Sequence, residues 1–215
     1  MTRLVIFDCD GVLVDSEPIA IRVDVEMFAE VGLTVSEQEV IECFVGRSPE
    51  LLARAVEEQL GHPPPDGWAE RGEQRLRAAF EHELRPVPGV VEALEEIDVP
   101  VCVASSSGHE SLRFKLERTG LYERFAGRIF SAADVANGKP APDLFLHAAA
   151  QMGVDAPECV VVEDSRYGVQ AARAAGMDVL AYAGGLTPAE VLDGPRTVVF
   201  GDMRKLPGLI AVRRP

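Results

Sequence analysis

Short apolar runs alternate with amphipathic segments along most of this 215-residue chain. The first run, Leu4–Phe7, has four consecutive large apolar residues, which is typical of a strand buried on both faces of a parallel sheet. Further strands are expected at Val99–Ala104, Arg128–Phe130, Cys159–Val162, Asp178–Tyr182 and Thr197–Phe200, with helices at Pro88–Ile97, Glu110–Arg118, Pro142–Met152 and Tyr167–Ala175. Strands that alternate with helices predict an α/β fold with a doubly wound parallel sheet.

The segment that follows the first strand has a different pattern. It is rich in Glu, Ala, Arg and Leu, and its apolar positions recur at helical spacing. Ser36 followed by Glu39 predicts a capping box at one helix start, and Ser48 is expected to cap the next helix. The sequence therefore predicts a Rossmann-like α/β core, residues 1–15 and 86–215, with an all-helical domain, residues 16–85, inserted after the first strand.

Composition and charge narrow the classes of function. The net charge of −14 disfavours a nucleic-acid partner, because phosphate contacts require clustered Lys and Arg. No apolar run approaches the roughly 18 residues of a membrane span, and no signal-peptide pattern precedes Leu4. The cysteines lack the paired spacing of a zinc site and are expected in a reducing compartment. These observations favour a cytoplasmic protein without a membrane partner, and a monomer is the expected state.

Polar side chains follow four of the predicted strands, each at the point where the strand ends. Because the carboxyl ends of parallel strands meet at one edge of a sheet, we expect these side chains to lie close together. They are Asp8 and Asp10 after the first strand, Ser105 after the second, Lys139 after the third, and Glu163 with Asp164 after the fourth. Clustered carboxylates repel unless a cation or a proton is present, so the set indicates a divalent metal and phosphoryl transfer.

Each of these residues alone has an ordinary structural explanation. An Asp-x-Asp pair is commonly a turn, and Ser105 or Ser107 could be a helix N-cap. Lys139 could be a solvated surface lysine, and Glu163-Asp164-Ser165 could simply begin the following helix. Four such coincidences, in order, at four successive strand ends are improbable, and the functional interpretation is therefore preferred.

These motifs resemble those of a known enzyme family. The segments Asp8–Glu17, Ser105, Lys139–Asp143 and Glu163–Ser165 are similar to the four motifs of the haloacid dehalogenase superfamily, and the resemblance spans nearly the whole chain. Within it, the chain resembles the branch with a helical cap after the first strand, which contains β-phosphoglucomutase, phosphoglycolate phosphatase and small sugar-phosphate phosphatases. The resemblance implies Mg²⁺-dependent hydrolysis of small phosphorylated metabolites through an aspartyl-phosphate.

The resemblance also implies roles for individual residues. Asp8 is the nucleophile, and Asp10 is the acid that protonates the leaving alcohol and later the base that activates water. Ser105 donates a hydrogen bond to the phosphoryl group, and Lys139 neutralises charge. Mg²⁺ is held by Asp8, by the backbone carbonyl of Asp10 and by Asp164, with Glu163 as a nearby carboxylate.

The same resemblance suggests which residues contact the substrate. The Ser106 amide is expected to bind the phosphoryl group together with Ser105. The resemblance implies that the helical cap closes over the site and decides which ester is accepted. Arg47 lies in a cap loop where related proteins contact the substrate, and His109 is expected near the entrance of the site.

Four alternatives to a phosphatase are considered. Dehalogenases of the superfamily lack an acid two residues after the nucleophile, so Asp10 argues against them. β-Phosphoglucomutases carry a histidine where Ala20 aligns, so the mutase alternative is weaker than a phosphatase. A phospho-accepting signalling receiver domain would be shorter and would lack the helical insertion. The complete motif set argues against a non-catalytic binding protein.

Overall fold

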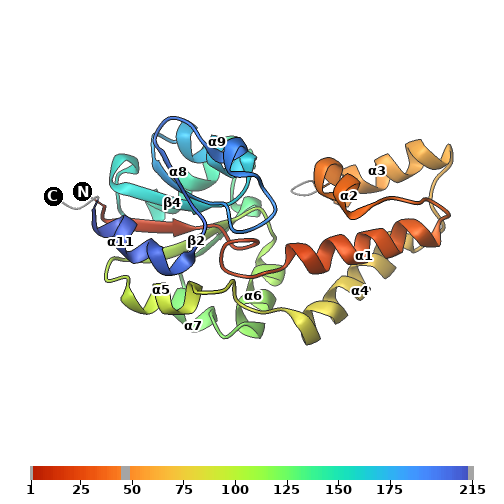
Figure 1. The fold of residues 1–215 in the computed structure, drawn as a ribbon, viewed down its shortest axis with the longest axis horizontal. Helices are drawn as coiled ribbons and strands as arrows, with labels where there is room; N and C mark the ends of the chain where they lie inside the picture. The colour runs from red at the N-terminus through yellow and green to blue at the C-terminus, as the bar shows by residue number, and fades with distance from the viewer. Residues whose placement is uncertain (1, 45–48, 213–215) are drawn as a thin grey trace. The chain divides into compact units, whose positions relative to one another are not determined.

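The computed structural model describes residues 2–44 and 49–212. Within these residues, six strands form one parallel sheet in the order β3-β2-β1-β4-β5-β6 (Figure 1). The strands are β1 Leu4–Phe7, β2 Val101–Ser105, β3 Ile129–Ser131, β4 Cys159–Glu163, β5 Asp178–Tyr182 and β6 Thr197–Phe200. The expected doubly wound α/β fold is confirmed.

The strand order reverses at β1, which lies between β2 and β4. Val5 pairs with Val101 on one side and with Val160 on the other. At such a reversal the connections leave in opposite directions, and the crevice outside the carboxyl ends of the strands is where open α/β sheets bind ligands. Asp8 directly follows β1 and Asp164 directly follows β4, so both acids lie at this point of the fold.

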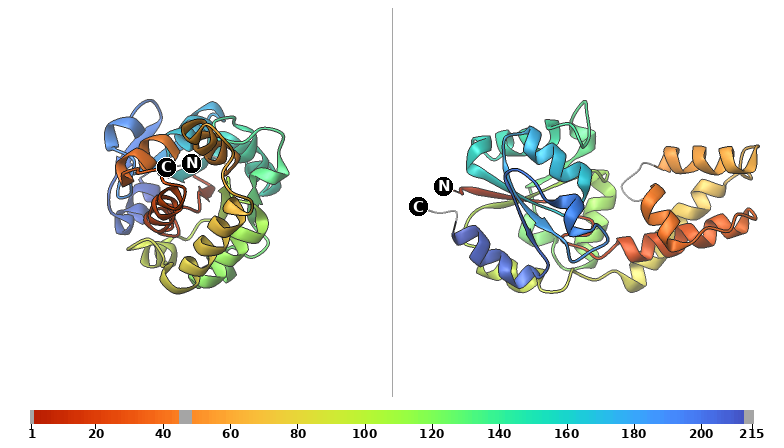
Figure 2. Two further views of the ribbon diagram at one scale, coloured as in Figure 1. Left: turned by 90° about the vertical axis from the view of Figure 1, so that its right-hand side faces the viewer. Right: turned by 45° about the horizontal axis from the view of Figure 1, so that its top comes forward.

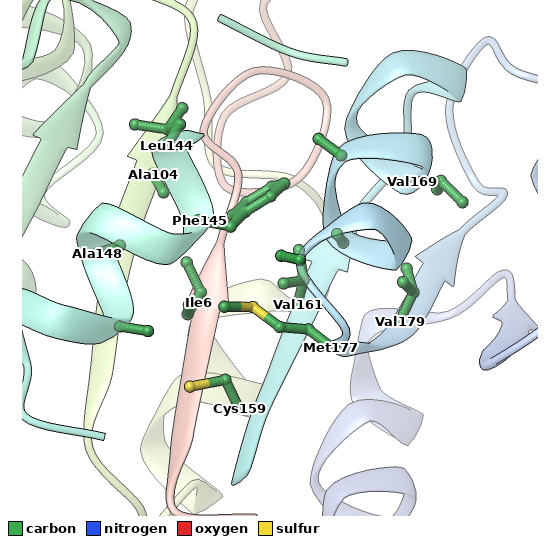
Figure 3. Close-up of a cluster of buried hydrophobic side chains, with 14 of the residues drawn as sticks. Ile6, Ala104, Leu144, Phe145, Ala148, Cys159, Val161, Val169, Met177 and Val179 are labelled. Carbon is green, nitrogen blue, oxygen red and sulfur yellow. The ribbon is translucent and has the colours of Figure 1, made fainter. Parts of the chain in front are cut away.

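Alternate residues of the strands face opposite layers of helices. Ile6 of β1, Ala104 of β2 and Val161 of β4 lie in one buried cluster with Phe145 (Figure 3). This alternation follows from the two-residue repeat of a strand. Phe7, the next residue of β1, instead packs edge-on against Phe125, with ring centroids 6.0 Å apart. The central strands β1, β2 and β4 are thus buried on both faces, and their ends are fixed in position.

Helices cover both faces of the sheet. In Figure 1, α8 and α9 lie on one side of it, and α5, α7 and α11 lie on the other. The bounds of the helices that accompany the sheet are α5 Val90–Glu96, α6 His109–Arg118, α7 Tyr122–Phe125, α8 Asp143–Gln151, α9 Arg166–Ala174, α10 Ala189–Leu192 and α11 Leu206–Ala211. Short 3₁₀ turns occur at Ala132–Asp134, Ala156–Glu158 and Met203–Lys205.

The chain divides into two units. Met1–Asp15 and Arg85–Pro215 form one, here called the α/β unit, and Ser16–Leu84 forms the other, here called the helical unit. The helical unit contains α1 Glu17–Glu30, α2 Glu37–Phe44, α3 Pro49–Leu60 and α4 Trp68–Glu83, coloured from red to yellow in Figure 2. No helix in the described part of the chain is long and apolar enough to cross a membrane.

Local sequence signals explain the helical unit. The predicted capping box is present, because the Ser36 backbone N donates to Glu39 and the Glu39 backbone N donates to the Ser36 hydroxyl. Helices α1 and α4 pack against each other, and the indole nitrogen of Trp68 donates to the Met27 carbonyl at 3.1 Å. The predicted cap at Ser48 lies outside the described residues.

A partly buried acid in α1 makes the stability of the protein depend on pH. Burial raises the pKa of Asp24 from 3.8 to about 6. The folded state therefore binds its proton more tightly than the unfolded state does, and stability falls as the pH rises from about 4 to 6. We predict that Asp24→Asn stabilises the protein by about 1–3 kcal/mol at pH 8 and has little effect at pH 4.

Chemical denaturation at both pH values measures this difference. Asp66→Asn, which changes an exposed acid of the same unit, is the control and is expected to have no effect. Equal effects of Asp24→Asn at pH 4 and pH 8 would contradict the prediction.

Candidate active site

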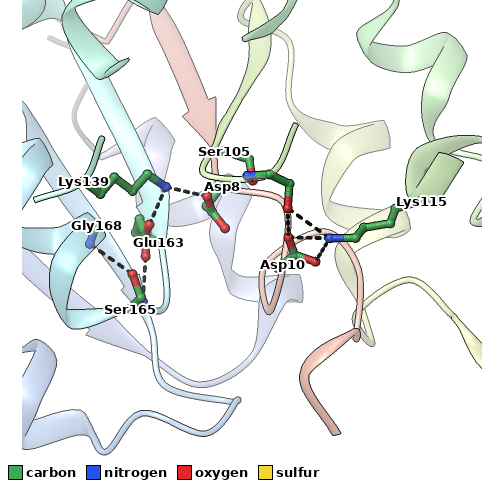
Figure 4. Close-up of polar contacts among 9 residues, drawn as sticks. Asp8, Asp10, Ser105, Lys115, Lys139, Glu163, Ser165 and Gly168 are labelled. Carbon is green, nitrogen blue, oxygen red and sulfur yellow. Dashed lines mark hydrogen bonds and ion pairs between the residues drawn. The ribbon is translucent and has the colours of Figure 1, made fainter. Parts of the chain in front are cut away.

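A buried ion pair lies at the end of β1. Lys139 Nζ donates to Asp8 Oδ1 at 2.5 Å and to Glu163 Oε1 at 2.8 Å (Figure 4). The three side chains come from the loops after β1 and β3 and from the end of β4, and they are 5%, 10% and 1% exposed for Lys139, Asp8 and Glu163. The structure thus brings together three of the residues that the sequence singled out.

The surroundings of Lys139 keep its amine charged and in place. Burial alone would lower the pKa of Lys139, but the negative charges of Asp8 and Glu163 raise it above its ordinary value. The amine also lies 4.8 Å from the centroid of the Phe145 ring, a cation–π contact. A turn in which the Ala141 amide donates to the Gly138 carbonyl precedes α8 and carries the lysine.

Asp8 lies among more negative charge than the single positive charge of Lys139 can neutralise. The pKa of Asp8 is raised to about 7, chiefly by burial; the charge of Lys139 opposes the rise, and the charges of Glu163 and Asp10 contribute to it. A carboxylate in this position gains from a further cation, because a second positive charge would favour its ionised form.

Glu163 is held from two sides. Its Oε2 accepts a hydrogen bond from the Ser165 backbone N at 2.6 Å, while its Oε1 accepts from Lys139. Ser165 is the N-cap of α9 and accepts from the Gly168 backbone N at 3.0 Å. Gly168 lies so close to Glu163 that a Cβ atom there would overlap the carboxylate. A glycine at this position is therefore a condition for the placement of Glu163.

Asp10 has a separate set of partners. Lys115 Nζ donates to its Oδ1 at 2.6 Å and to its Oδ2 at 2.8 Å, and the Ser107 hydroxyl donates to Oδ2 at 2.9 Å (Figure 4). The chain turns immediately after Asp10 at Gly11, which has a φ of 74° that other residues rarely adopt. The two aspartates of the motif thus contact different lysines.

Sequence reasoning missed Lys115, although a signal for it exists. Lys115 lies on α6 between the buried residues Leu112 and Leu116, at the spacing of a core-facing helix stripe. A lysine in such a position is rarely buried unless its charge is matched. Burial alone would lower the pKa of Lys115, but the charge of Asp10 raises it. Ser107, considered above as a helix cap, instead bonds to Asp10, and α6 begins after Gly108 without a side-chain cap.

The remaining predicted residues differ in how the structure places them. The Ser105 side chain is buried and its hydroxyl accepts from the Ser107 backbone N at 3.2 Å, while Ser106 is exposed. His109 is exposed and its ring contacts Asp134 at 2.8 Å. Arg47 lies outside the described residues. The proposed roles of these residues in binding substrate stay predictions.

The carboxylates at the ends of β1 and β4 fit a magnesium ion. Asp8 and Asp164 are both buried, and the Oδ2 atom of Asp164 accepts no hydrogen bond from the described residues, although the residue has other interactions. In the described residues, no three His, Cys, Asp or Glu side chains form a metal cage. Mg²⁺ rarely uses such cages, because it binds through one or two carboxylates and keeps several waters. The donor set present is the kind that Mg²⁺ prefers.

Comparisons with known proteins agree with this fold. The profile of the haloacid dehalogenase-like hydrolase family matches residues 5–182. The 6-phosphogluconate phosphatase of Escherichia coli (strain K12) is 32% identical over 216 residues, which cover 99% of this chain and 97% of that protein. The chain therefore belongs to the haloacid dehalogenase-like hydrolase family. It is an enzyme, a phosphatase of that family.

Solved structures share the architecture. A conserved haloacid dehalogenase-like protein of unknown function from Agrobacterium tumefaciens str. C58 is 38% identical, with a TM-score of 0.87 and 99% of each chain covered. A family hydrolase from Deinococcus radiodurans R1, with bound phosphate and sodium, is 32% identical, with a TM-score of 0.83 over 98% of this chain and 96% of that one.

The contact between Gly168 and Glu163 leads to a prediction. An alanine in a helix usually stabilises it relative to glycine, but Gly168→Ala would displace Glu163 and remove one of the two carboxylates that hold Lys139. We expect kcat for p-nitrophenyl phosphate to fall about 10–100-fold, since a misplaced charged donor costs transition-state stabilisation. Steady-state kinetics measures this loss.

The matched control is Gly208→Ala in α11, where a Cβ atom would meet nothing within 4 Å. This variant is expected to retain full activity. Wild-type kcat in Gly168→Ala would show that the position of Glu163 does not matter for turnover.

Proposed function

We propose that the protein is a Mg²⁺-dependent phosphatase of small phosphorylated metabolites, and that it acts through an aspartyl-phosphate on Asp8. The observation that carries the proposal is the pairing of the two aspartates with two different lysines. Asp8 contacts Lys139 within a buried group of charges, whereas Asp10 contacts Lys115 and is 27% exposed. Two carboxylates in different surroundings can take different roles in one reaction.

Asp8 is assigned as the nucleophile. One of its oxygens forms a bond to phosphorus while the bond from phosphorus to the alcohol oxygen of the substrate breaks. Lys139 supports this step because its buried positive charge offsets the charge of the transferring group, and a charge acts more strongly where water is excluded. The Ser105 hydroxyl, at the end of β2, is assigned as a donor to the phosphoryl oxygens.

Asp10 is assigned as the acid and the base. It gives a proton to the departing alcohol in the first step, and it takes a proton from the water that attacks phosphorus in the second. The second step releases inorganic phosphate and restores the Asp8 carboxylate. The proton that Asp10 gives up is thus returned within each turnover.

Asp8, Asp164 and the backbone carbonyl of Asp10 are assigned to Mg²⁺. When bound, the ion supplies positive charge that lowers the repulsion between a carboxylate and a phosphate ester. Glu163 is assigned a different task, because both of its oxygens already accept hydrogen bonds, from Lys139 and from the Ser165 amide. It holds Lys139 against Asp8.

Hydrolysis is favoured over isomerisation of a phosphosugar. The similarity to 6-phosphogluconate phosphatase over nearly the full length supports a sugar phosphate or sugar-acid phosphate as substrate. Ala20 stands where the resemblance places the histidine of β-phosphoglucomutases, and an alanine cannot align an acid with a substrate. A phosphatase of sugar-acid or sugar phosphates is the activity that these observations support best.

Replacing the nucleophile tests the proposal. We expect Asp8→Asn to reduce turnover of p-nitrophenyl phosphate by at least about 10⁴-fold, because the amide cannot form the acyl phosphate. Removal of divalent metal with EDTA should abolish wild-type turnover, and Mg²⁺ should restore it. Release of p-nitrophenol measures both effects.

Asp155→Asn is the control, since this exposed acid precedes β4 at the opposite edge of the sheet. It is expected to leave kcat unchanged. Full activity of Asp8→Asn, or full activity of the wild type without divalent metal, would contradict the proposal.

A substrate screen separates phosphatase from mutase. We expect the substrate with the highest kcat/KM to be one of 6-phosphogluconate, phosphoglycolate and the hexose phosphates. Its turnover should release inorganic phosphate and alcohol in a 1:1 ratio. Assays of phosphate release and of glucose 6-phosphate formation measure the two activities. Faster conversion of β-glucose 1-phosphate to glucose 6-phosphate than its hydrolysis would show a mutase instead.

A further inference from the structure

Lys115 is a buried charge that the four motifs do not include. Its side chain is 8% exposed, and its amine contacts both carboxylate oxygens of Asp10. A buried ion pair commonly gives no net gain in stability over well-packed apolar residues, because desolvation of both charges opposes their attraction. The need for a packed core therefore does not explain this lysine.

The Asp10 carboxylate that Lys115 contacts also accepts a hydrogen bond from Ser107, in the loop after β2. Ser107 donates its hydroxyl to Asp10 and is itself held from two sides. Its backbone N donates to the Ser105 hydroxyl at 3.2 Å, and its carbonyl accepts from the Ser131 hydroxyl at 2.8 Å. Lys115 Nζ also contacts the Ser107 hydroxyl at 3.1 Å. Helix α6 and the loop after β2, which accepts a hydrogen bond from Ser131 of β3, thus hold the Asp10 side chain together.

We propose that Lys115 is a positioning residue that, with Ser107, holds the Asp10 carboxylate in the orientation from which it exchanges protons with the alcohol and water oxygens. This inference rests on the proposed function of Asp10. Proton transfer requires a hydrogen-bond distance between the carboxylate and the reacting oxygen, and two donors on one carboxylate restrict its rotation about χ1 and χ2. Without the amine, Asp10 would retain Ser107 and would rotate more freely.

The dependence of rate on the leaving group distinguishes this role from others. A good leaving group departs without a proton, whereas a basic alkoxide needs one from Asp10. The ratio kcat/KM covers the steps up to departure of the leaving group, so the later hydrolysis of the aspartyl-phosphate does not affect it. p-Nitrophenyl, phenyl and benzyl phosphate form a series of increasing leaving-group basicity with rings of similar size.

We expect Lys115→Met to lower kcat/KM for benzyl phosphate about 10–100-fold and for p-nitrophenyl phosphate less than about threefold, since general acid catalysis contributes about 10²–10⁴ in rate. Methionine is similar in length to lysine and fills the same space. Ser107→Ala, which removes the other donor, should show the same pattern with a smaller loss. Lys115→Arg, which keeps a cation, should recover part of the benzyl phosphate activity.

Other outcomes would overturn the inference. Equal losses for all three esters would assign Lys115 to phosphoryl binding or to the fold alone, and equal activity of Lys115→Met and wild type would show no role. Lys205→Met, the same change at an exposed lysine, is the control and should leave all three rates unchanged. If Lys115→Met fails to fold, the pattern of Ser107→Ala decides.

The experiment also separates this inference from the proposed function. Loss of activity in Asp8→Asn together with an unchanged leaving-group dependence in Lys115→Met would leave the phosphatase mechanism in place and overturn only the role of Lys115. A fully active Asp8→Asn would overturn the proposed function, and the inference with it.

Discussion

The contact between Lys139 and the two carboxylates of Asp8 and Glu163 is the interaction on which the site depends. Charges that are buried to this degree require close partners, because removing one of them leaves another without compensation. The contact joins the ends of β1 and β4 with the loop after β3, at the reversal of strand order. The sheet therefore brings the charges together, and the charges in turn hold these three segments in contact.

This arrangement leaves the site with more negative than positive charge. Asp8, Glu163 and Asp164 lie at the ends of the paired strands β1 and β4, and the single charge of Lys139 balances one of the three. The raised pKa of Asp8 expresses the same imbalance, since burial and its acidic neighbours make the carboxylate hard to ionise. A divalent cation and a phosphoryl group complement this site in opposite ways. A bound cation would reduce the repulsion between the carboxylates, and a bound phosphoryl group would accept hydrogen bonds from the donors.

The two aspartates of the first motif are only one residue apart, yet their surroundings differ. Asp8 is fixed by a buried loop lysine, and Asp10 by a helix lysine and a serine hydroxyl. The turn at Gly11 redirects the chain directly after them. The proposed roles of nucleophile and acid–base group need different surroundings, and the lysines that contact the two aspartates come from separate parts of the fold, the loop after β3 and helix α6.

Much of this could be predicted from the sequence, because the apolar runs and the helix signals are local. The strands Asp178–Tyr182 and Thr197–Phe200 have the predicted bounds. Asp8 and Lys139 were expected together, since parallel strands end at one edge. The contact from Lys115 to Asp10 spans 105 residues, and no short motif marks it.

The other features that the sequence did not reveal are also long-range or very short. Gly168 leaves the space that the Glu163 carboxylate occupies, and this close approach cannot be seen in the composition. The short helices Tyr122–Phe125 and Ala189–Leu192 have too few residues to display a helical repeat. Local pattern thus pointed to the candidate residues, and only the three-dimensional structure shows the contacts that position them.

The most direct test of the central claim is a crystal structure of the wild-type protein with Mg²⁺ and beryllium trifluoride, a mimic of a transferred phosphoryl group. The account predicts density for the trifluoride on a carboxylate oxygen of Asp8, with the Lys139 amine within hydrogen-bond distance of a fluorine. Density attached to Asp10, to Glu163 or to any other side chain would contradict it.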